Sequence, residues 1–323
     1  MGDTSKMPFI KWTGSKRKQA PYIVDQFPKE INTYVECFLG GGSVMHELLN
    51  RIYLGEITCK RIICSDVNID LITLWRMLAD KEKRQKLFDY YCDLHYKLKE
   101  RAGYVGGDVT EEHVRKCQTL YYEKRDEYNG YIERNEYTEE RAMLFYWITR
   151  TAFNGLIRYN NKTGKFNASF HVGGRFGIQP SELKEVFSSW GAVIDNFVDN
   201  GGRLEFYACS YDEIISGFGN GDVIYMDPPY DKVKGTYFCN EFSIEQLNRI
   251  IEYLTESGAK VLLSYDGTSG EEDRTSDKIE HWYVRHEYVD SGHSSFKKLK
   301  VKVTKEKKNK DVVKDSLYIN YYL

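Results

Sequence analysis

Proline, paired cysteines and long apolar runs are scarce or absent in this chain of 323 residues, which has only 6 prolines. No apolar run approaches the roughly 18 residues that a membrane-spanning helix needs. The 7 cysteines show no C-x-x-C spacing, so neither a zinc site nor a disulfide framework is indicated and we expect no bound metal. The polar first residues, 1–8, do not resemble a signal peptide. These absences favour a reduced compartment inside the cell.

A strong charge of either sign is also missing, because the formal net charge is only -2 at pH 7. The small net charge hides a segregation of basic and acidic residues along the chain. Basic residues concentrate at Lys6, Lys11, Lys16, Arg17 and Lys18, at Arg150, Arg158, Lys162, Lys165 and Arg175, and between Lys297 and Lys310. Acidic residues concentrate in Glu136–Glu140 and Glu271–Asp277. Basic stripes are compatible with phosphate contacts, although a solvated face is the simpler interpretation of any single stretch.

Strand-like and helical segments alternate along much of the chain, and its 41% of hydrophobic residues suffices for a folded core. Strands are predicted at 33–37, 61–64, 203–208, 222–226, 260–264 and 316–323. Helices are predicted at 43–49, 71–78 and 243–256. This alternation favours a mainly parallel α/β sheet. Residues 80–150 look charged and helical, and the turn signal at 160–164 between two extended runs predicts a hairpin.

The sharpest chemical signal is Asp227-Pro228-Pro229-Tyr230, directly after the apolar run 223–226. Ligands bind at the carboxyl ends of strands in open parallel sheets. An exocyclic amino nitrogen is a poor nucleophile because its lone pair is delocalised into the ring. A carboxylate and a free backbone carbonyl that accept both N–H protons would localise that lone pair, and an aromatic ring could stack on the base. The alternative interpretation is a strand that ends in a proline turn.

A glycine cluster, Gly40-Gly41-Gly42, lies between the first predicted strand and its helix. Such a turn lets the backbone approach a bound nucleotide closely, although a dinucleotide fingerprint or a simple tight turn would look alike. It is not a P-loop, because the G-K-[ST] ending is missing. Asp66 ends the second strand, where a carboxylate could hold ribose hydroxyls or could merely cap a helix.

These motifs together resemble the Dam-type (D12 class, alpha group) DNA adenine N6-methyltransferases. Lys11–Lys16 is similar to the family's K-W-x-G-[GS]-K motif, and Glu36–Ser43 is similar to its glycine loop. Asp66 with Asn68, Phe153–Asn160 continued by Gly164–Asn167, Ser210-Tyr211 and Asp227–Tyr230 resemble four further motifs in the family's order. The hairpin departs from the family's P-[FY]-G ending, because this chain has Ala168–His171 there.

The resemblance implies a role for each matched residue, with S-adenosylmethionine as cofactor. Cofactor-binding residues would be Trp12, Lys16, Glu36, Phe38, Gly40, Gly42, Asp66, Ser210, Tyr211 and Asp227. The catalytic residues would be Asp227, Pro228, Pro229 and Tyr230, which would hold a flipped adenine. DNA-binding residues would be Phe153, Asn154, Leu156, Arg158, Asn160 and Lys165. The alternative role of Phe153 is in the core of the hairpin. The alternative for the lysine-rich stretch 297–310 is simple solvation.

The fold implied is an α/β, Rossmann-like S-adenosylmethionine-dependent methyltransferase with a mixed sheet, mostly parallel with one antiparallel strand, and an inserted helical and hairpin target-recognition domain. Residues 1–70 and 190–323 would form the catalytic and cofactor-binding domain, and 71–189 the insert. The partner would be double-stranded DNA, with GATC suggested by the hairpin and a cognate restriction endonuclease as a further partner. We expect a monomer in the cytoplasm of a bacterium or inside a phage or viral host cell, with no membrane contact.

Three other functions compete with this interpretation. Related proline motifs serve amino methylation of RNA or of protein glutamine, but the large insert with its Asn/Arg hairpin favours duplex DNA. A catalytically silent DNA-binding module would not need Asp227 or the glycine loop. A dinucleotide oxidoreductase would need a different loop and would leave Asp227–Tyr230 unexplained.

Overall fold

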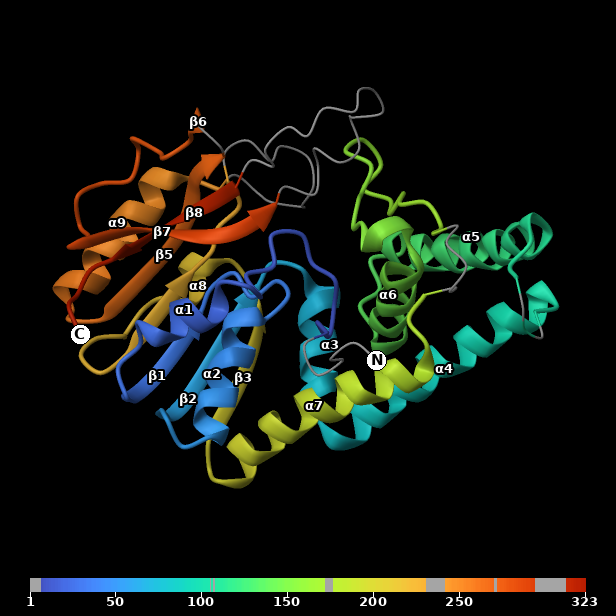
Figure 1. Ribbon diagram of the computed structural model, residues 1–323, viewed down its shortest axis with the longest axis horizontal. Helices are drawn as coiled ribbons and strands as arrows, with labels where there is room; N and C mark the ends of the chain where they lie inside the picture. The colour runs from blue at the N-terminus through green and yellow to red at the C-terminus, as the bar shows by residue number, and fades with distance from the viewer. Residues whose placement is uncertain are drawn as a thin grey trace.

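The computed structural model describes residues 7–104, 106, 108–171, 177–230, 242–269, 272–293 and 312–323. Its centre is one sheet with the strand order β3-β2-β1-β4-β5-β8-β7, drawn on the left of Figure 1. The strands are β1 Glu30–Glu36, β2 Thr58–Asp66, β3 Arg203–Ala208, β4 Val223–Met226, β5 Lys260–Ser269, β7 Arg285–His293 and β8 Val312–Ile319. β1 to β5 pair in parallel, whereas β8 is antiparallel to both of its neighbours. The predicted mixed Rossmann-like sheet is confirmed, and a two-residue strand, β6 Glu272–Asp273, adds one antiparallel bridge to β5.

Helices cover both faces of the sheet because side chains alternate along its central strands. Tyr34, Ile62 and Leu262 belong to one buried cluster, and their neighbours belong to a second. The first cluster packs against α1 Ala20–Asp25, α2 Ser43–Tyr53, α3 Ile69–Ala79 and α7 Pro180–Asp199. The second packs against α8 Tyr211–Ile214 and α9 Ile244–Glu256. Period-two alternation with both faces apolar is typical of a sheet buried in a three-layer α/β fold.

Three helices extend to the right of the sheet in Figure 1, as the charged helical stretch predicted. They are α4 Lys81–Ala102, α5 Glu111–Glu133 and α6 Glu139–Thr151. Each begins at a side-chain N-cap, supplied by Asp80, Thr110 and Thr138. All residues of α6 from Arg141 to Thr151 are buried, so α6 is the core of this helical group. α7, which the sequence pattern did not predict, packs against both α2 and α4.

A buried ion pair fixes the helical group to the sheet domain. The guanidinium of Arg141 on α6 lies 2.8 Å from the carboxylate of Asp70 on α3. The hydroxyl of Tyr128 on α5 donates to the same carboxylate at 2.6 Å and lies 3.1 Å from the hydroxyl of Tyr159. Two helices of the group and the segment after α6 therefore meet at one acidic residue of α3.

The predicted hairpin folds back on itself, but its extended runs form only isolated bridges. A short 3-10 turn, η2 Phe153–Gly155, is followed by the bridge between Tyr159 and Phe166, and a second bridge joins Ala152 to Phe170. The side chain of Asn160 accepts hydrogen bonds from the backbone N–H groups of Lys162 and Thr163 and so caps the turn. We refer to residues 152–170 as the hairpin segment.

Several expectations need correction. Arg150 is not part of an exposed basic cluster, because its side chain is 4% exposed and donates to the backbone carbonyls of Pro8 and Phe9. The last strand begins at Val312 and ends at Ile319, not at the C-terminus. Lys6, Arg175 and the stretch 297–310 lie outside the described residues. Within the described parts of the chain, no helix is both long and apolar enough to span a membrane.

Candidate active site

A cavity of about 950 Å³ opens where the chain leaves β1 and β4. These strands are neighbours, but the chain continues from β1 to one side of the sheet and from β4 to the other. Such a topological switch point is where open α/β sheets bind ligands. The cavity is lined by every residue predicted for cofactor binding or catalysis, from Trp12 to Tyr230. The structure thus brings together segments that are more than two hundred positions apart in the sequence.

The glycine loop follows β1, lines the cavity and has no room for a side chain at Gly40 or Gly42. Gly40 and Gly42 adopt left-handed backbone conformations, with φ of 46° and 62°. A Cβ atom on Gly42 would lie 2.7 Å from Cη2 of the buried Trp75, and one on Gly40 would lie 2.8 Å from Cδ1 of Trp12. Both the backbone conformation and the contacts therefore demand glycine. Gly42 also ends the loop as the N-cap of α2.

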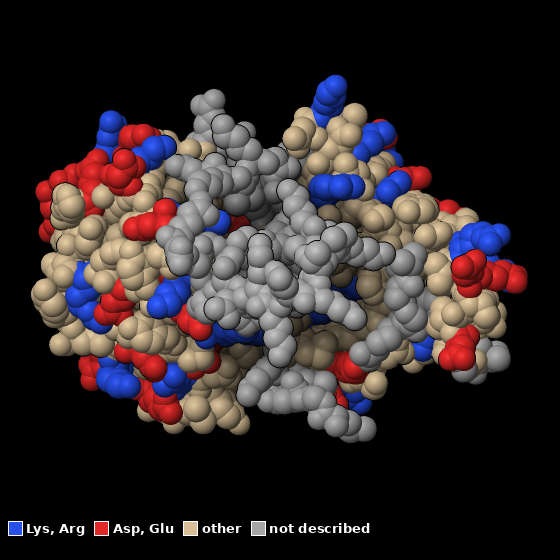
Figure 2. All heavy atoms as spheres, turned by 45° about the horizontal axis from the view of Figure 1, so that its top comes forward, with Lys and Arg blue, Asp and Glu red and all other residues tan. Residues whose placement is uncertain are grey.

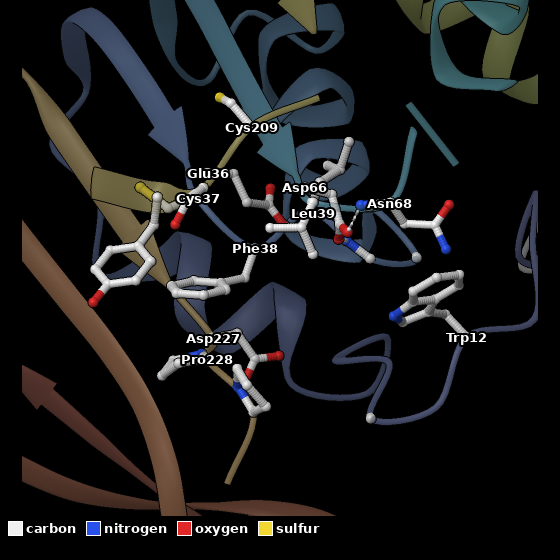
Figure 3. Close-up of a pocket in the computed structure, with 18 of the residues that line it drawn as sticks. Trp12, Glu36, Cys37, Phe38, Leu39, Asp66, Asn68, Cys209, Asp227 and Pro228 are labelled. Carbon is white, nitrogen blue, oxygen red and sulfur yellow. Dashed lines mark hydrogen bonds between the residues drawn. The ribbon is translucent and has the colours of Figure 1, made fainter. Parts of the chain in front are cut away.

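Asp66 fastens the end of β2 to this loop. Its carboxylate accepts the N–H of Gly40 and the N–H of Asn68, both at 3.0 Å, as the dashed lines of Figure 3 indicate. Burial raises the pKa of Asp66, and these two backbone donors oppose that rise. The alternative that Asp66 caps α3 is wrong, because the side chain of Asn68 accepts the N–H of Leu71 and is the N-cap.

Glu36, at the end of β1, is a buried carboxylate inside the cavity and is 3% exposed. The hydroxyl of Tyr34 donates to it at 2.9 Å. Burial raises its pKa to about 8. In Figure 3, Glu36 and Asp66 lie close together, with Phe38 on one side of the view and Trp12 on the other. A cationic group of a ligand placed here would stabilise the ionised form of Glu36.

Asp227 follows β4 and belongs to a network of charged residues. The ammonium of Lys16 lies 2.9 Å from Oδ1 of Asp227 and 3.2 Å from Oδ2 of Asp315 on β8. The same ammonium donates to the hydroxyl of Tyr230 at 2.8 Å. Burial raises the pKa of Asp227 to about 6, although Lys16 opposes the rise. Lys16, predicted to bind the cofactor, thus lies in the cavity as the ion-pair partner of the catalytic motif.

Aromatic rings form the remaining wall of the cavity. The ring of Phe38 lies 5.2 Å from that of Tyr211 and 6.3 Å from that of Phe242. The ring of Tyr230 lies 5.3 Å from that of Tyr265 on β5. Ser210 stands at the N-cap of α8, where its backbone N–H donates to Glu213. Flat apolar walls beside buried carboxylates suit a ligand that has both an aromatic ring and charged groups.

The residues predicted to bind DNA lie outside the cavity. Within the hairpin segment Ile157 and Tyr159 line the cavity, whereas Arg158 between them is exposed. Phe153 is half-buried, with its ring 5.9 Å from that of His171, so it takes part in the packing of the segment. Asn154 is exposed and has a φ of 55°. Leu156 is half-buried, and Lys165 is paired with Glu133 on α5.

The sequence analysis missed several residues of the site. Four of them make the polar contacts described above, namely Asp70, Arg141, Tyr159 and Asp315. The first three line the cavity, and Asp315 contacts Lys16. The only sequence signal for Asp315 was an isolated acidic residue at the start of an apolar strand.

Comparison with known proteins now adds to this geometry. The family of D12 class N6 adenine-specific DNA methyltransferases matches residues 12–305 of this chain. The chain belongs to this family. Membership makes it an adenine-specific DNA methyltransferase, with DNA as substrate and a methyl donor as co-substrate.

Relatives of this methyltransferase come from several kinds of organism. It is 31% identical to a DNA adenine methylase of Escherichia coli K12 over 80% of this chain and 81% of the relative. It is 26% identical to Type II methyltransferase M.MjaIII of Methanocaldococcus jannaschii, over 80% and 83% of the two chains. It is 24% identical to Type II methyltransferase M.CviBI of Paramecium bursaria Chlorella virus NC1A, over 81% and 83%. Among solved structures, rRNA methyltransferase aviRa of Streptomyces viridochromogenes aligns with 99% of this chain and 92% of the aviRa chain, at 10% sequence identity. The TM-score of 0.40 is too low for this similarity to bear on fold or substrate.

Proposed function

We propose that this methyltransferase transfers a methyl group from S-adenosylmethionine to N6 of an adenine in duplex DNA. The observation that carries the proposal is that the glycine loop, Asp66 and Asp227 line one cavity at the switch point of the sheet. S-adenosylmethionine combines an adenine ring, ribose hydroxyls, an ammonium and a sulfonium. Among the described residues no cationic side chain pairs with Glu36 or Asp66, so a ligand with positive charge complements this part of the cavity.

The same cavity accounts for the chemistry at adenine. When bound, S-adenosylmethionine would supply a methyl group on a positively charged sulfur, which leaves as a neutral thioether when the C–S bond breaks. The carboxylate of Asp227 and the carbonyl of Pro228 accept hydrogen bonds from the two N–H groups of the adenine amino group. These hydrogen bonds localise the nitrogen lone pair. The ring of Tyr230 stacks on the base. The amino proton leaves through Asp227 or solvent as the new bond forms, and no covalent enzyme intermediate is needed.

The adenine must leave the duplex to reach Asp227, because a cavity at the end of a sheet strand cannot reach an amino group inside the base stack. Unstacking costs a few kcal/mol, and contacts in the pocket offset part of that cost.

We propose that residues 71–189, including α4 to α6 and the hairpin segment, recognise the DNA, while 1–70 and 190–323 bind the cofactor and catalyse. α7 spans residue 190 and packs on both parts. In Figure 2, Lys and Arg side chains stand out on the upper part of the helical half, while both signs of charge mix over the sheet half.

The proposed reaction is tested by incubating the full chain with duplex DNA, RNA and a glutamine-containing protein, each with methyl-labelled S-adenosylmethionine. Label in N6-methyladenine of duplex DNA alone is expected. Label in RNA or protein instead would exclude the proposal, and binding of DNA without any label would indicate a silent binding module. Mapping N6-methyladenine in the DNA of expressing cells then tests our proposed site, GATC. We propose further that the protein is a monomer and that it has a cognate restriction endonuclease as a partner. We also propose that it acts inside a bacterial, phage or viral host cell.

Cofactor binding by Asp66 is tested by Asp66→Ala. We expect the Kd for S-adenosylmethionine to rise roughly 10- to 100-fold, because the glycine loop loses a charge-assisted hydrogen bond and the ligand loses a carboxylate. Isothermal titration calorimetry gives the Kd. Asp80→Ala is the matched control, since Asp80 also accepts two backbone N–H groups but does so at the start of α4. An unchanged Kd for Asp66→Ala would refute the assignment.

Base reading by Arg158 is tested by Arg158→Ala. The guanidinium donates to the side-chain oxygen of Asn167 at 2.7 Å and to the backbone carbonyl of Asn167 at 3.1 Å. These bonds hold the exposed, planar guanidinium across the hairpin segment. We expect a loss of discrimination at one base pair of about 1–3 kcal/mol, measured as kcat/KM on substituted duplexes. The exposed Lys162 in the turn serves as control, because Lys162→Ala should affect all sequences alike. A uniform loss for Arg158→Ala would show that it contacts phosphate.

A further inference from the structure

Asp315 lies on the antiparallel strand β8, far in sequence from both the glycine loop and the catalytic motif. Its Oδ2 is 3.2 Å from the ammonium of Lys16 and accepts a hydrogen bond from Nε2 of Gln19 at 3.0 Å. Its side chain is 13% exposed. Gln19 is itself buried, just before α1. The segment that carries Lys16 is therefore tied to β8 at two points through one carboxylate.

The ammonium of Lys16 uses all of its donors inside the active site. An ammonium has three N–H groups, and Lys16 has three acceptors, Asp227, Asp315 and Tyr230. Two of these acceptors are in the catalytic motif, and the third is Asp315. Lysine is a compact charge on a flexible four-carbon stem, so its position depends on its partners. With Asp315 in place, the ammonium is held between two strands that flank β5.

We propose that Asp315 is a positioning residue for methyl transfer, which holds Lys16 where its ammonium orients the Asp227 carboxylate and the Tyr230 ring toward the adenine. This inference rests on the proposed role of Asp227. Asp315 contacts neither substrate nor cofactor in the proposed reaction and acts through Lys16 and through the hydroxyl of Tyr230, with which its carboxylate also interacts. A displacement of a catalytic group by about 1 Å can cost about 100-fold in rate, so loss of the tether should be visible in kcat.

The charges around Asp227 predict a change in the pH dependence of methyl transfer that general misfolding would not produce. The groups that act on the Asp227 carboxyl include Lys16, Asp315 and Tyr230, while Tyr225 and Glu36 also lie near it and Asp266 acts on Tyr230. Burial raises the pKa of Asp227 to about 6, Lys16 lowers it and Asp315 raises it. Loss of Asp315 removes a repulsive charge but also releases Lys16, which acts on Asp227 more strongly than Asp315 does, so the pKa of Asp227 should rise, as it does when the charge of Lys16 itself is removed.

The test measures methyl transfer to duplex DNA by the full chain as a function of pH, for the unaltered protein, Asp315→Asn and Lys16→Met. An ionised carboxylate accepts an N–H more strongly than the protonated acid does and can take up the amino proton, so the unaltered kcat/KM should fall as the pH drops through about 6. Asp315→Asn should lower kcat at pH 8 roughly 10- to 100-fold without changing KM, and should move the acidic fall to higher pH, because the released Lys16 no longer lowers the pKa of Asp227. Lys16→Met should move the fall further in the same direction. Asp315→Glu, which keeps the charge, should restore the pH profile and part of kcat.

Two further variants separate the possible failures. Glu205→Gln removes an ion-paired strand carboxylate at the far edge of the sheet, where Glu205 pairs with Arg61, and should leave the pH profile unchanged. Asp227→Asn should abolish transfer. If Asp227→Asn remains active, the proposed role of Asp227 fails. If Asp227→Asn is inactive but Asp315→Asn retains both kcat at pH 8 and the acidic fall of the unaltered chain, only the positioning role of Asp315 is overturned.

Discussion

Asp227→Ala should lower the rate of methyl transfer by about a thousandfold or more, while the affinity for S-adenosylmethionine changes little. In the proposed reaction the carboxylate is directed at the amino group of the adenine, whereas the cofactor would be held mainly by the glycine loop, Glu36 and Asp66. Asp227 is half-buried and pairs with the buried Lys16, which keeps its carboxylate in one place. Single-turnover incorporation of labelled methyl groups measures the rate, and calorimetric titration measures the affinity.

The sequence offers a matched control for this variant at the other end of β4. Asp222 precedes the strand, accepts the N–H groups of Thr33 and Gly219 at 3.0 Å each, and lies at the opposite edge of the sheet from the cavity. Asp222→Ala should affect stability but not the chemical step. Loss of both transfer and cofactor binding by Asp227→Ala, with the circular dichroism spectrum preserved, would contradict the division of labour between Asp227 and the loop.

Arg141→Met should lower the free energy of unfolding by about 3–5 kcal/mol, because it leaves the carboxylate of Asp70 buried without a cation. The two side chains are 8% and 6% exposed, so solvent cannot replace the lost partner. Burial raises the pKa of Asp70 and Arg141 opposes that rise, so removal of the arginine favours the protonated acid. Urea unfolding followed by circular dichroism gives the free energy. Because Asp70 joins α3 to α5 and α6, we also expect weaker DNA binding at temperatures below the unfolding transition.

A second variant separates the lost charge balance from lost packing. Replacing both partners, as Asp70→Leu with Arg141→Met, should recover much of the stability, because neither charge is then buried alone. Arg84→Met is a suitable comparison, since Arg84 forms a single ion pair with Asp195 and its partner is 27% exposed. It should cost clearly less than Arg141→Met. Equal losses from Arg84→Met and Arg141→Met would show that burial of the Asp70 pair carries no special weight.

Local patterns predicted the glycine loop and the strand before Asp227 well. The run of apolar residues before Asp227 predicted a strand that ends at that carboxylate, and β4 ends at Met226. The glycine cluster between a strand and a helix predicted a tight loop, and Gly42 caps α2. Ser243 was predicted as the N-cap of a helix, and it accepts the N–H of Gln246. In each case the signal lies within a few residues of the element that it specifies.

Elements whose patterns are set by distant partners were predicted less well. α7 was missed although its apolar residues, from Leu183 to Phe197, recur at helical spacing. β7 was missed because only Tyr288 and Val289 of its 9 residues are apolar, so it lacks an alternating apolar pattern. The hairpin segment was predicted as paired strands, but Asn160 caps its turn and only isolated bridges form. Arg150 was interpreted as a surface cation because its charge is visible in the sequence, whereas the backbone carbonyls that it binds belong to Pro8 and Phe9.

The sequence by itself determined the reaction class and most of the residues that line the cavity, because the chemistry is carried by short motifs that directly follow strands. Only the tertiary structure decided which charges meet. Parallel pairing of β1 with β4 places Asp227 beside the glycine loop, and antiparallel insertion of β8 next to β5 places Asp315 against Lys16. Lys16, which the resemblance assigned to cofactor binding, is thereby the ion-pair partner of Asp227. Ion pairs between residues about three hundred positions apart leave no periodic trace in a single sequence, since their energy depends on burial and distance, which the strand order sets.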